Sequence, residues 1–171
     1  MIQTSWPFGR AWLPDVAGTP LESSLERDAV LAANRPASAK PIRVLLIEDD
    51  ATIAEMYRVQ LDYDGYQVTV VNTGEGAIHA LEASRPDIIL LDLLLPDRSG
   101  LEVMVDINQA FSDHPPVVIL SNYGEPTMIE RGLSLGAAEY LVKSRVTPDS
   151  VSRSIPGWID QNSNAGPSRN D

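Results

Sequence analysis

Five short, mostly apolar runs recur along the chain from about residue 42, and each fits a strand buried on both faces. They cover residues 42–47, 67–71, 88–92, 117–121 and 139–143. Between them, apolar residues recur at spacings of three and four, which predicts amphipathic helices. Strict alternation of strand and helix predicts an α/β fold, a doubly wound, five-stranded parallel sheet with helices on both faces.

The last predicted helix contains a proline. It begins at Thr147-Pro148, where Thr147 can act as the N-cap and Pro148 suits the first helical position. Further along, Pro156 removes one backbone hydrogen bond and its ring clashes with the preceding turn. We therefore expect a kink at Pro156, or an end of the helix near Ser154.

The composition changes at about residue 40 and divides the chain into three parts. Residues 1–40 are expected to be an N-terminal extension, mostly disordered, in which a capping Thr19 is compatible with a short helix over 20–34. An aromatic cluster in residues 6–12 leaves open that this extension is a docking segment. Residues 41–160 form the predicted domain, and residues 161–171 a loose C-terminal tail.

Composition excludes several classes of function. The chain has no cysteine, so disulfides and thiolate chemistry are excluded. Its two histidines lie far apart in the sequence and match no metal-ligand spacing. Its net charge of −11 argues against nonspecific nucleic-acid binding. No apolar stretch approaches the roughly 20 residues of a membrane span. The N-terminus lacks the pattern of a secretory signal, so a cytoplasmic location is expected.

Carboxylates follow two of the predicted strands. Glu48-Asp49-Asp50 come directly after the first strand, and Asp92 ends the third. In open α/β sheets, ligand sites lie just past the carboxyl ends of the strands. If the two strands are neighbours, Glu48, Asp49 and Asp92 converge, and a hard divalent cation would relieve their repulsion. Asp50 is better explained as the N-cap of the following helix.

Two further polar residues end the fourth and fifth predicted strands, and together with the carboxylates they resemble a known family. Ser121 ends the fourth run and Lys143 the fifth, in the segments Val117–Ser121 and Gly136–Lys143. With the acidic residues, this set resembles the receiver domains of two-component response regulators over residues 41–155. The resemblance implies a flavodoxin-like fold with strand order 2-1-3-4-5.

The resemblance also implies the chemistry of the acidic residues. Asp92 is the expected phosphoacceptor, and Mg²⁺ is the expected cofactor. Its ligands would be Glu48, Asp49, Asp92 and the backbone carbonyl of Leu94. Phosphoryl transfer depends mainly on positioning and charge neutralisation, which such a cation supplies.

The remaining matches imply a switch. Lys143 would supply an ammonium to a phosphoryl oxygen, and Ser121 would donate its hydroxyl to another oxygen once the phosphoryl group is present. Tyr140 matches the aromatic residue that turns between exposed and buried positions in receivers. Where many receivers have a proline after the lysine, this chain has Ser144, so we predict a trans Lys143–Ser144 peptide.

The expected function is that of a stand-alone response regulator rather than an enzyme, because residues 144–171 are too few for an added output domain. Its phosphodonor would be a sensor histidine kinase or a histidine phosphotransfer protein. Its output would pass to a downstream target protein, without direct DNA or membrane binding. Output would use the face made by the fifth strand and the helices on either side of it in sequence, and a homodimer through that face is a further option.

Two alternatives stay open. One is a scaffold that keeps the fold without being phosphorylated. The other is a magnesium-dependent phosphohydrolase with an aspartate nucleophile, which usually needs an acid two residues after the nucleophile, where this chain has Leu94. We also hypothesise that Leu94 and Tyr123 shield the phosphoryl group from water, so that its hydrolysis is slow.

Overall fold

The computed structural model describes residues 40–164, and the predicted helix over 20–34 and the aromatic cluster lie outside them. The strands are β1 (Arg43–Ile47), β2 (Gln67–Val71), β3 (Ile88–Asp92), β4 (Val117–Ser121) and β5 (Glu139–Val142). The helices are α2 (Ala51–Tyr63), α3 (Gly74–Ser84), α4 (Gly100–Ala110), α5 (Pro126–Ser134) and α6 (Pro148–Asn164), with a 3₁₀ turn η1 (Lys143–Arg145). The described elements therefore alternate as the apolar pattern predicts.

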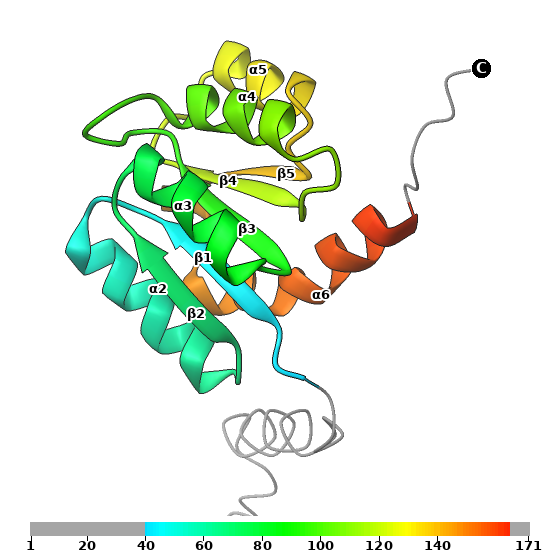
Figure 1. Ribbon diagram of the computed structural model, residues 1–171. Helices are drawn as coiled ribbons and strands as arrows, with labels where there is room; N and C mark the ends of the chain where they lie inside the picture. The colour runs from blue at the N-terminus through cyan, green and yellow to red at the C-terminus, as the bar shows by residue number, and fades with distance from the viewer. Residues whose placement is uncertain (1–39, 165–171) are drawn as a thin grey trace, which may run out of the picture. The chain divides into compact units, whose positions relative to one another are not determined.

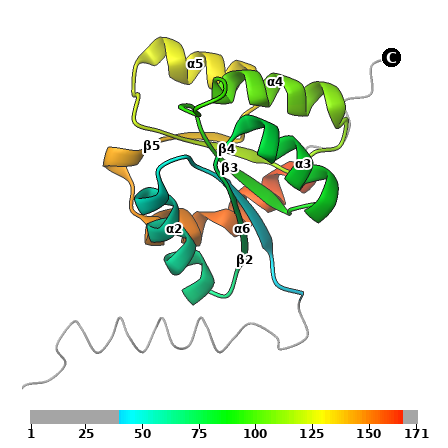
Figure 2. The ribbon, with the colours of Figure 1, turned by 60° about the vertical axis from the view of Figure 1, so that its left-hand side comes forward.

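All five strands are parallel and follow the order β2-β1-β3-β4-β5, which confirms the predicted topology. The three inner strands are almost fully buried because helices cover both faces of the sheet (Figure 1). Two separate groups of buried side chains lie on the two faces. One lies under α3, α4 and α5, and the other under α2 and α6. Figure 2 shows these two sets of helices on opposite faces of the sheet.

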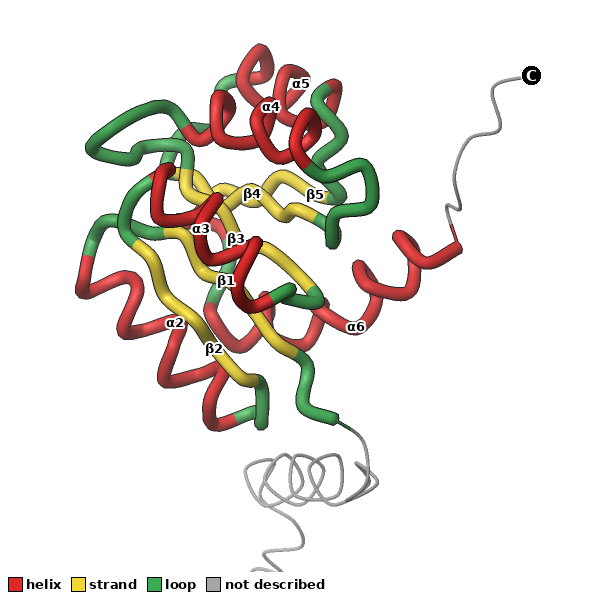
Figure 3. Tube along the Cα trace, in the orientation of Figure 1, coloured by secondary structure: helices red, strands yellow, loops and turns green. Residues whose placement is uncertain are grey.

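Of the two outcomes expected from Pro156, a kink there or an end near Ser154, the early end is wrong, because helix α6 continues to Asn164 (Figure 3). Pro156 has no N–H to donate to the carbonyl of Ser152 one turn earlier. In the fold, the hydroxyl of the buried Tyr66 donates to that same carbonyl oxygen at 3.0 Å. Tyr66, which lies 86 positions before Ser152, thus donates to the carbonyl that Pro156 leaves without a helical donor, and the helix continues past the proline.

Three smaller expectations can be compared with the fold. The described residues contain no cis peptide bond, so Lys143–Ser144 is trans as predicted. The last turn of α6 takes in residues 161–164, the first part of the segment expected to be a tail. Among residues 40–164, no helix has the length and apolar character needed to cross a bilayer.

Candidate functional site at the carboxyl edge of the sheet

The polar residues singled out in the sequence lie together because the strands are parallel and in register. Ile47 is paired with Leu91, so Glu48 and Asp92 are the next residues at the ends of β1 and β3. On the other side, Asp92 is paired with Leu120 and Ser121 with Val142. Glu48, Asp92, Ser121 and Lys143 therefore emerge from four adjacent strands at one edge of the sheet.

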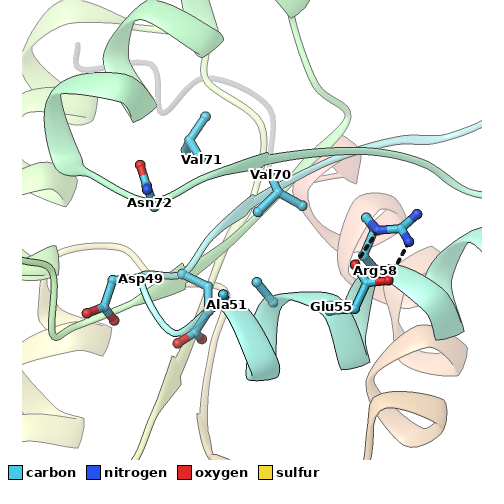
Figure 4. A pocket seen from close by; sticks show the side chains of 9 residues that line it. Asp49, Ala51, Glu55, Arg58, Val70, Val71 and Asn72 are labelled. Carbon is cyan, nitrogen blue, oxygen red and sulfur yellow. Dashed lines mark hydrogen bonds and ion pairs between the residues drawn. The ribbon is translucent and has the colours of Figure 1, made fainter.

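Three carboxylates form a compact cluster at this edge. One oxygen from each of Glu48, Asp49 and Asp92 lies within 4.8 Å of the others. Glu48 and Asp92 are only 2% and 4% exposed, whereas Asp49 is exposed. Figure 4 shows Asp49 beside a pocket of about 380 Å³ between the start of α2 and the end of β2. The cluster is therefore buried on one side and open to solvent on the other.

Lys143 bridges the two buried carboxylates. Its Nζ donates to Glu48 Oε2 at 2.5 Å and to Asp92 Oδ2 at 2.9 Å, and its side chain is only 7% exposed. Burial raises the pKa of Glu48 to about 7, while Lys143 acts against this rise and the charge of Asp92 adds to it. One ammonium thus pairs with both buried carboxylates.

The donor set fits a hard divalent cation. Glu48 Oε1 is buried and has no hydrogen-bond partner in residues 40–164, although buried carboxylate oxygens are normally paired. The carboxylate of Glu48 belongs to the same cluster as those of Asp49 and Asp92. Mg²⁺ takes oxygen ligands and is usually held by one or two carboxylates together with water and phosphate oxygens. The residues present are of the type and number that this ion requires.

The carboxylate of Asp92 is fixed by the chain that follows it. Its Oδ1 accepts from the backbone N–H of Leu93 at 2.6 Å and from that of Leu94 at 3.3 Å. Helix α4 then begins at Gly100, whose N–H donates to the carbonyl of Leu93 at 2.9 Å. The β3–α4 segment therefore folds back tightly beside Asp92.

Gly100 makes this close return possible, and its role was not predicted from the sequence. A Cβ atom at position 100 would lie 2.2 Å from the backbone oxygen of Asp92. No side chain could be accepted there without moving β3 or α4. The only signal in the sequence is a glycine directly after Ser99, the residue that caps α4 in the structure, and such a glycine by itself has many explanations.

Ser121 and Tyr140 are linked through one backbone residue. Ser121 is fully buried, and its Oγ accepts from the N–H of Tyr123 at 3.1 Å. The hydroxyl of Tyr140 donates to the carbonyl of the same Tyr123 at 2.9 Å. Tyr140 is 7% exposed, and a Cβ atom on Gly132 of α5 would lie 2.9 Å from its ring. The β4–α5 loop thus connects the site to Tyr140 in its buried position.

Asp50 is the N-cap of α2, as predicted. Its Oδ1 accepts from the N–H groups of Thr52 at 2.8 Å and Ile53 at 3.1 Å. These backbone hydrogen bonds, from Ile53 first and then Thr52, hold the pKa of Asp50 below its ordinary value. Asp50 therefore serves the helix and is not one of the clustered acids.

Comparisons with known proteins agree with this geometry. The family model described as response regulator receiver domain matches residues 44–153. The chain is 31% identical over 119 residues to the transcriptional regulatory protein TrcR of Mycobacterium tuberculosis, covering 68% of this chain and 45% of that protein. It is 32% identical over 111 residues to the DNA-binding response regulator MtrA of Mycobacterium leprae, covering 65% and 48%.

Solved structures share the fold. A CheY-like response regulator receiver domain protein from Methanospirillum hungatei superimposes with a TM-score of 0.67 and 23% identity, covering 74% of this chain and 100% of that one. This likeness concerns the fold alone. The chain spans about half the length of the curated relatives that it matches.

Proposed function

Because this chain belongs to the response regulator receiver family, we propose that Asp92 is its phosphoacceptor. A carboxylate oxygen of Asp92 would form a bond to the phosphorus of a phosphodonor, while the bond from phosphorus to the leaving group breaks and its electron pair departs with that group. The bridge from Lys143 to Asp92 and Glu48, at 2.9 and 2.5 Å, is the observation that carries this proposal. In this position the ammonium of Lys143 would stabilise the negative charge that develops on the phosphoryl oxygens.

Mg²⁺ is the proposed cofactor. Glu48, Asp49 and Asp92 would hold it, and the backbone carbonyl of Leu94 is proposed as a further ligand. When bound, the ion would neutralise the acidic cluster and draw the phosphoryl oxygens toward Asp92. The buried Oε1 of Glu48 supports this assignment, because it is a carboxylate oxygen that has no hydrogen-bond partner in residues 40–164.

The phosphoryl group is proposed to act through Ser121 and Tyr140. The hydroxyl of Ser121 now faces the N–H of Tyr123, and it has its own proton free to donate to a phosphoryl oxygen. A move of Ser121 would carry the backbone of Tyr123, to which Tyr140 is bonded. Phosphorylation would thereby change the surface formed by α5, β5 and α6, through which we propose that the chain binds a target protein or a second copy of itself.

The proposed phosphodonor is a sensor histidine kinase or a histidine phosphotransfer protein, with the chain in the cytoplasm. The proposed role is regulation rather than turnover of a substrate. The phosphoryl group would be lost only through self-dephosphorylation. The relatives named as transcriptional or DNA-binding regulators match over only part of their length, so their binding to DNA is not carried over. The net charge of −11 supports output through protein contacts.

Incubation with acetyl phosphate and Mg²⁺ tests the proposal. Mass spectrometry should find one phosphoryl group on Asp92 that hydroxylamine removes, absent without the ion and in Asp92→Asn. A folded wild-type protein that forms no adduct would support the phosphorylation-independent scaffold. Continuous release of phosphate from varied esters would instead support a hydrolase, which the leucine at position 94 argues against.

A further inference from the structure

The segment between Asp92 and α4 is tied to a different helix by one carboxylate. Asp97 Oδ1 accepts from the N–H of Gly74 at 2.9 Å, and Oδ2 accepts from the N–H of Glu75 at 3.0 Å. These are the first two residues of α3, which precede Asp97 by more than twenty positions in the chain. The two backbone bonds lower the pKa of Asp97, with the bond from Gly74 as the larger cause.

The start of α3 thus has two separate caps. The first-turn N–H groups of a helix have no partner within the helix. Thr73, the adjacent N-cap residue, takes only the N–H of Gly76, through its Oγ1 at 3.0 Å. Asp97 accepts hydrogen bonds from the N–H groups of Gly74 and Glu75, and its negative charge lies at the positive end of the helix dipole. The two caps serve one helix end, but only Asp97 also holds the β3–α4 segment.

This contact closes a ring of bonds that runs through two of the proposed cation ligands. The N–H of Glu48 donates to the carbonyl of Val71 at 3.0 Å, which fixes the end of β1 to the end of β2. Val71 is followed along the chain by Gly74, whose N–H donates to Asp97. Asp97 and Leu94 lie in the same short segment between β3 and α4. The ring therefore joins two of the proposed ligand positions, Glu48 and Leu94, through groups that do not touch the cation.

The far end of the segment is already attached to α4. Ser99 and Glu102 form a capping box, and Arg98 pairs with Asp106 at 2.5 Å. Leu94 forms a backbone bridge to Ser99. With its end fixed to α4 in this way, the segment meets α3 in the described structure through the two hydrogen bonds of Asp97 and the packing of Arg98 over Gly74.

We propose that Asp97 is a positioning residue for the phosphorylation site. Its carboxylate holds the 93–99 segment against the start of α3, and this contact sets where the Leu94 backbone lies relative to Asp92. The inference rests on the proposed function only for the identity of the cation. The contact itself is independent of any ion.

Three variants separate positioning from simple helix capping. Asp97→Ala removes both bonds, Thr73→Ala removes the other cap of the same helix end, and Glu75→Gln removes a charge nearby while leaving both caps. The Mg²⁺ dissociation constant, measured by isothermal titration calorimetry, should rise roughly 10-fold in Asp97→Ala. It should change by less than about twofold in the two controls, while urea unfolding should show similar stability losses for the two cap variants.

Hydrogen exchange of the metal-free protein supplies a readout without the ion. Amides of residues 93–99 should exchange faster in Asp97→Ala and at the wild-type rate in Thr73→Ala. Equal exchange and equal Mg²⁺ affinity in these two variants would overturn the inference, even if the wild type forms the Asp92 adduct. If the wild type neither binds Mg²⁺ nor forms the adduct, the proposed function fails, and the exchange result still decides whether Asp97 holds the segment.

Discussion

Replacing Tyr66 with phenylalanine should destabilise the domain through the carbonyl of Ser152. In the fold that carbonyl is buried, and the N–H one turn later is missing because residue 156 is proline. Tyr66→Phe removes the hydroxyl and leaves the oxygen without that donor. A buried, unsatisfied carbonyl costs about 1–3 kcal/mol, which is the expected loss in the free energy of unfolding.

A double-mutant cycle with Pro156→Ala isolates this effect. Alanine restores the N–H at position 156, so the Ser152 carbonyl regains a helical donor. In that background, Tyr66→Phe should cost only about 0.5–1 kcal/mol. The Pro156→Ala variant alone should be more stable than wild type, by up to roughly 3 kcal/mol. The two substitutions should therefore show a coupling of about 1 kcal/mol or more.

Urea unfolding followed by far-UV circular dichroism measures all four proteins of the cycle. Tyr63→Phe is the matched control, since Tyr63 is 83% exposed and its hydroxyl loss should change stability by less than about 0.5 kcal/mol. A coupling below about 0.3 kcal/mol would refute the reasoning, because the tyrosine would then not replace the missing helical donor.

Three further predictions concern the site and its surroundings. Gly100→Ala should abolish phosphorylation and destabilise the fold by about 1–3 kcal/mol or more, since the new Cβ would lie 2.2 Å from the backbone oxygen of Asp92. Phosphate incorporation measures the first effect and urea unfolding the second. Leu94→Ala should shorten the lifetime of the acylphosphate severalfold, followed by phosphate release in Mg²⁺, and a wild-type half-life of seconds would contradict the shielding hypothesis. Asp87→Asn should lower the free energy of unfolding most near neutral pH, because the hydrogen bond from Arg43 lowers the folded-state pKa of Asp87. In urea titrations, the difference in the free energy of unfolding between variant and wild type should disappear as the pH falls below about 4, through the folded-state pKa.

The strands and their polar ends could be predicted because their signals are local. An aliphatic run that ends in an acid, a serine or a lysine defines both the strand and the edge at which its last side chain lies. Parallel pairing then brings Glu48, Asp92, Ser121 and Lys143 together without any further information. The N-cap role of Asp50 was predictable for the same reason, since its partners lie two and three residues away.

What the sequence could not give depends on contacts between distant residues. The proline rule predicted a kink or an early end of α6, but it could not include a hydroxyl supplied from the turn before β2. The hydrogen bonds from Gly74 and Glu75 to Asp97 likewise join loops that the pattern treats separately. The need for glycine at position 100 follows from a backbone approach that only the packed fold defines.

The bridge from Lys143 has a consequence for how a cation enters the pocket. The ammonium already pairs with Glu48 and Asp92, so Mg²⁺ binding at the proposed site would exchange one positive partner for another. The ion pairs that would have to loosen would lower the net affinity for the ion. A neutral side chain at position 143 is therefore expected to bind Mg²⁺ more tightly, and, if Asp92 is the phosphoacceptor as proposed, to weaken the phosphorylated form.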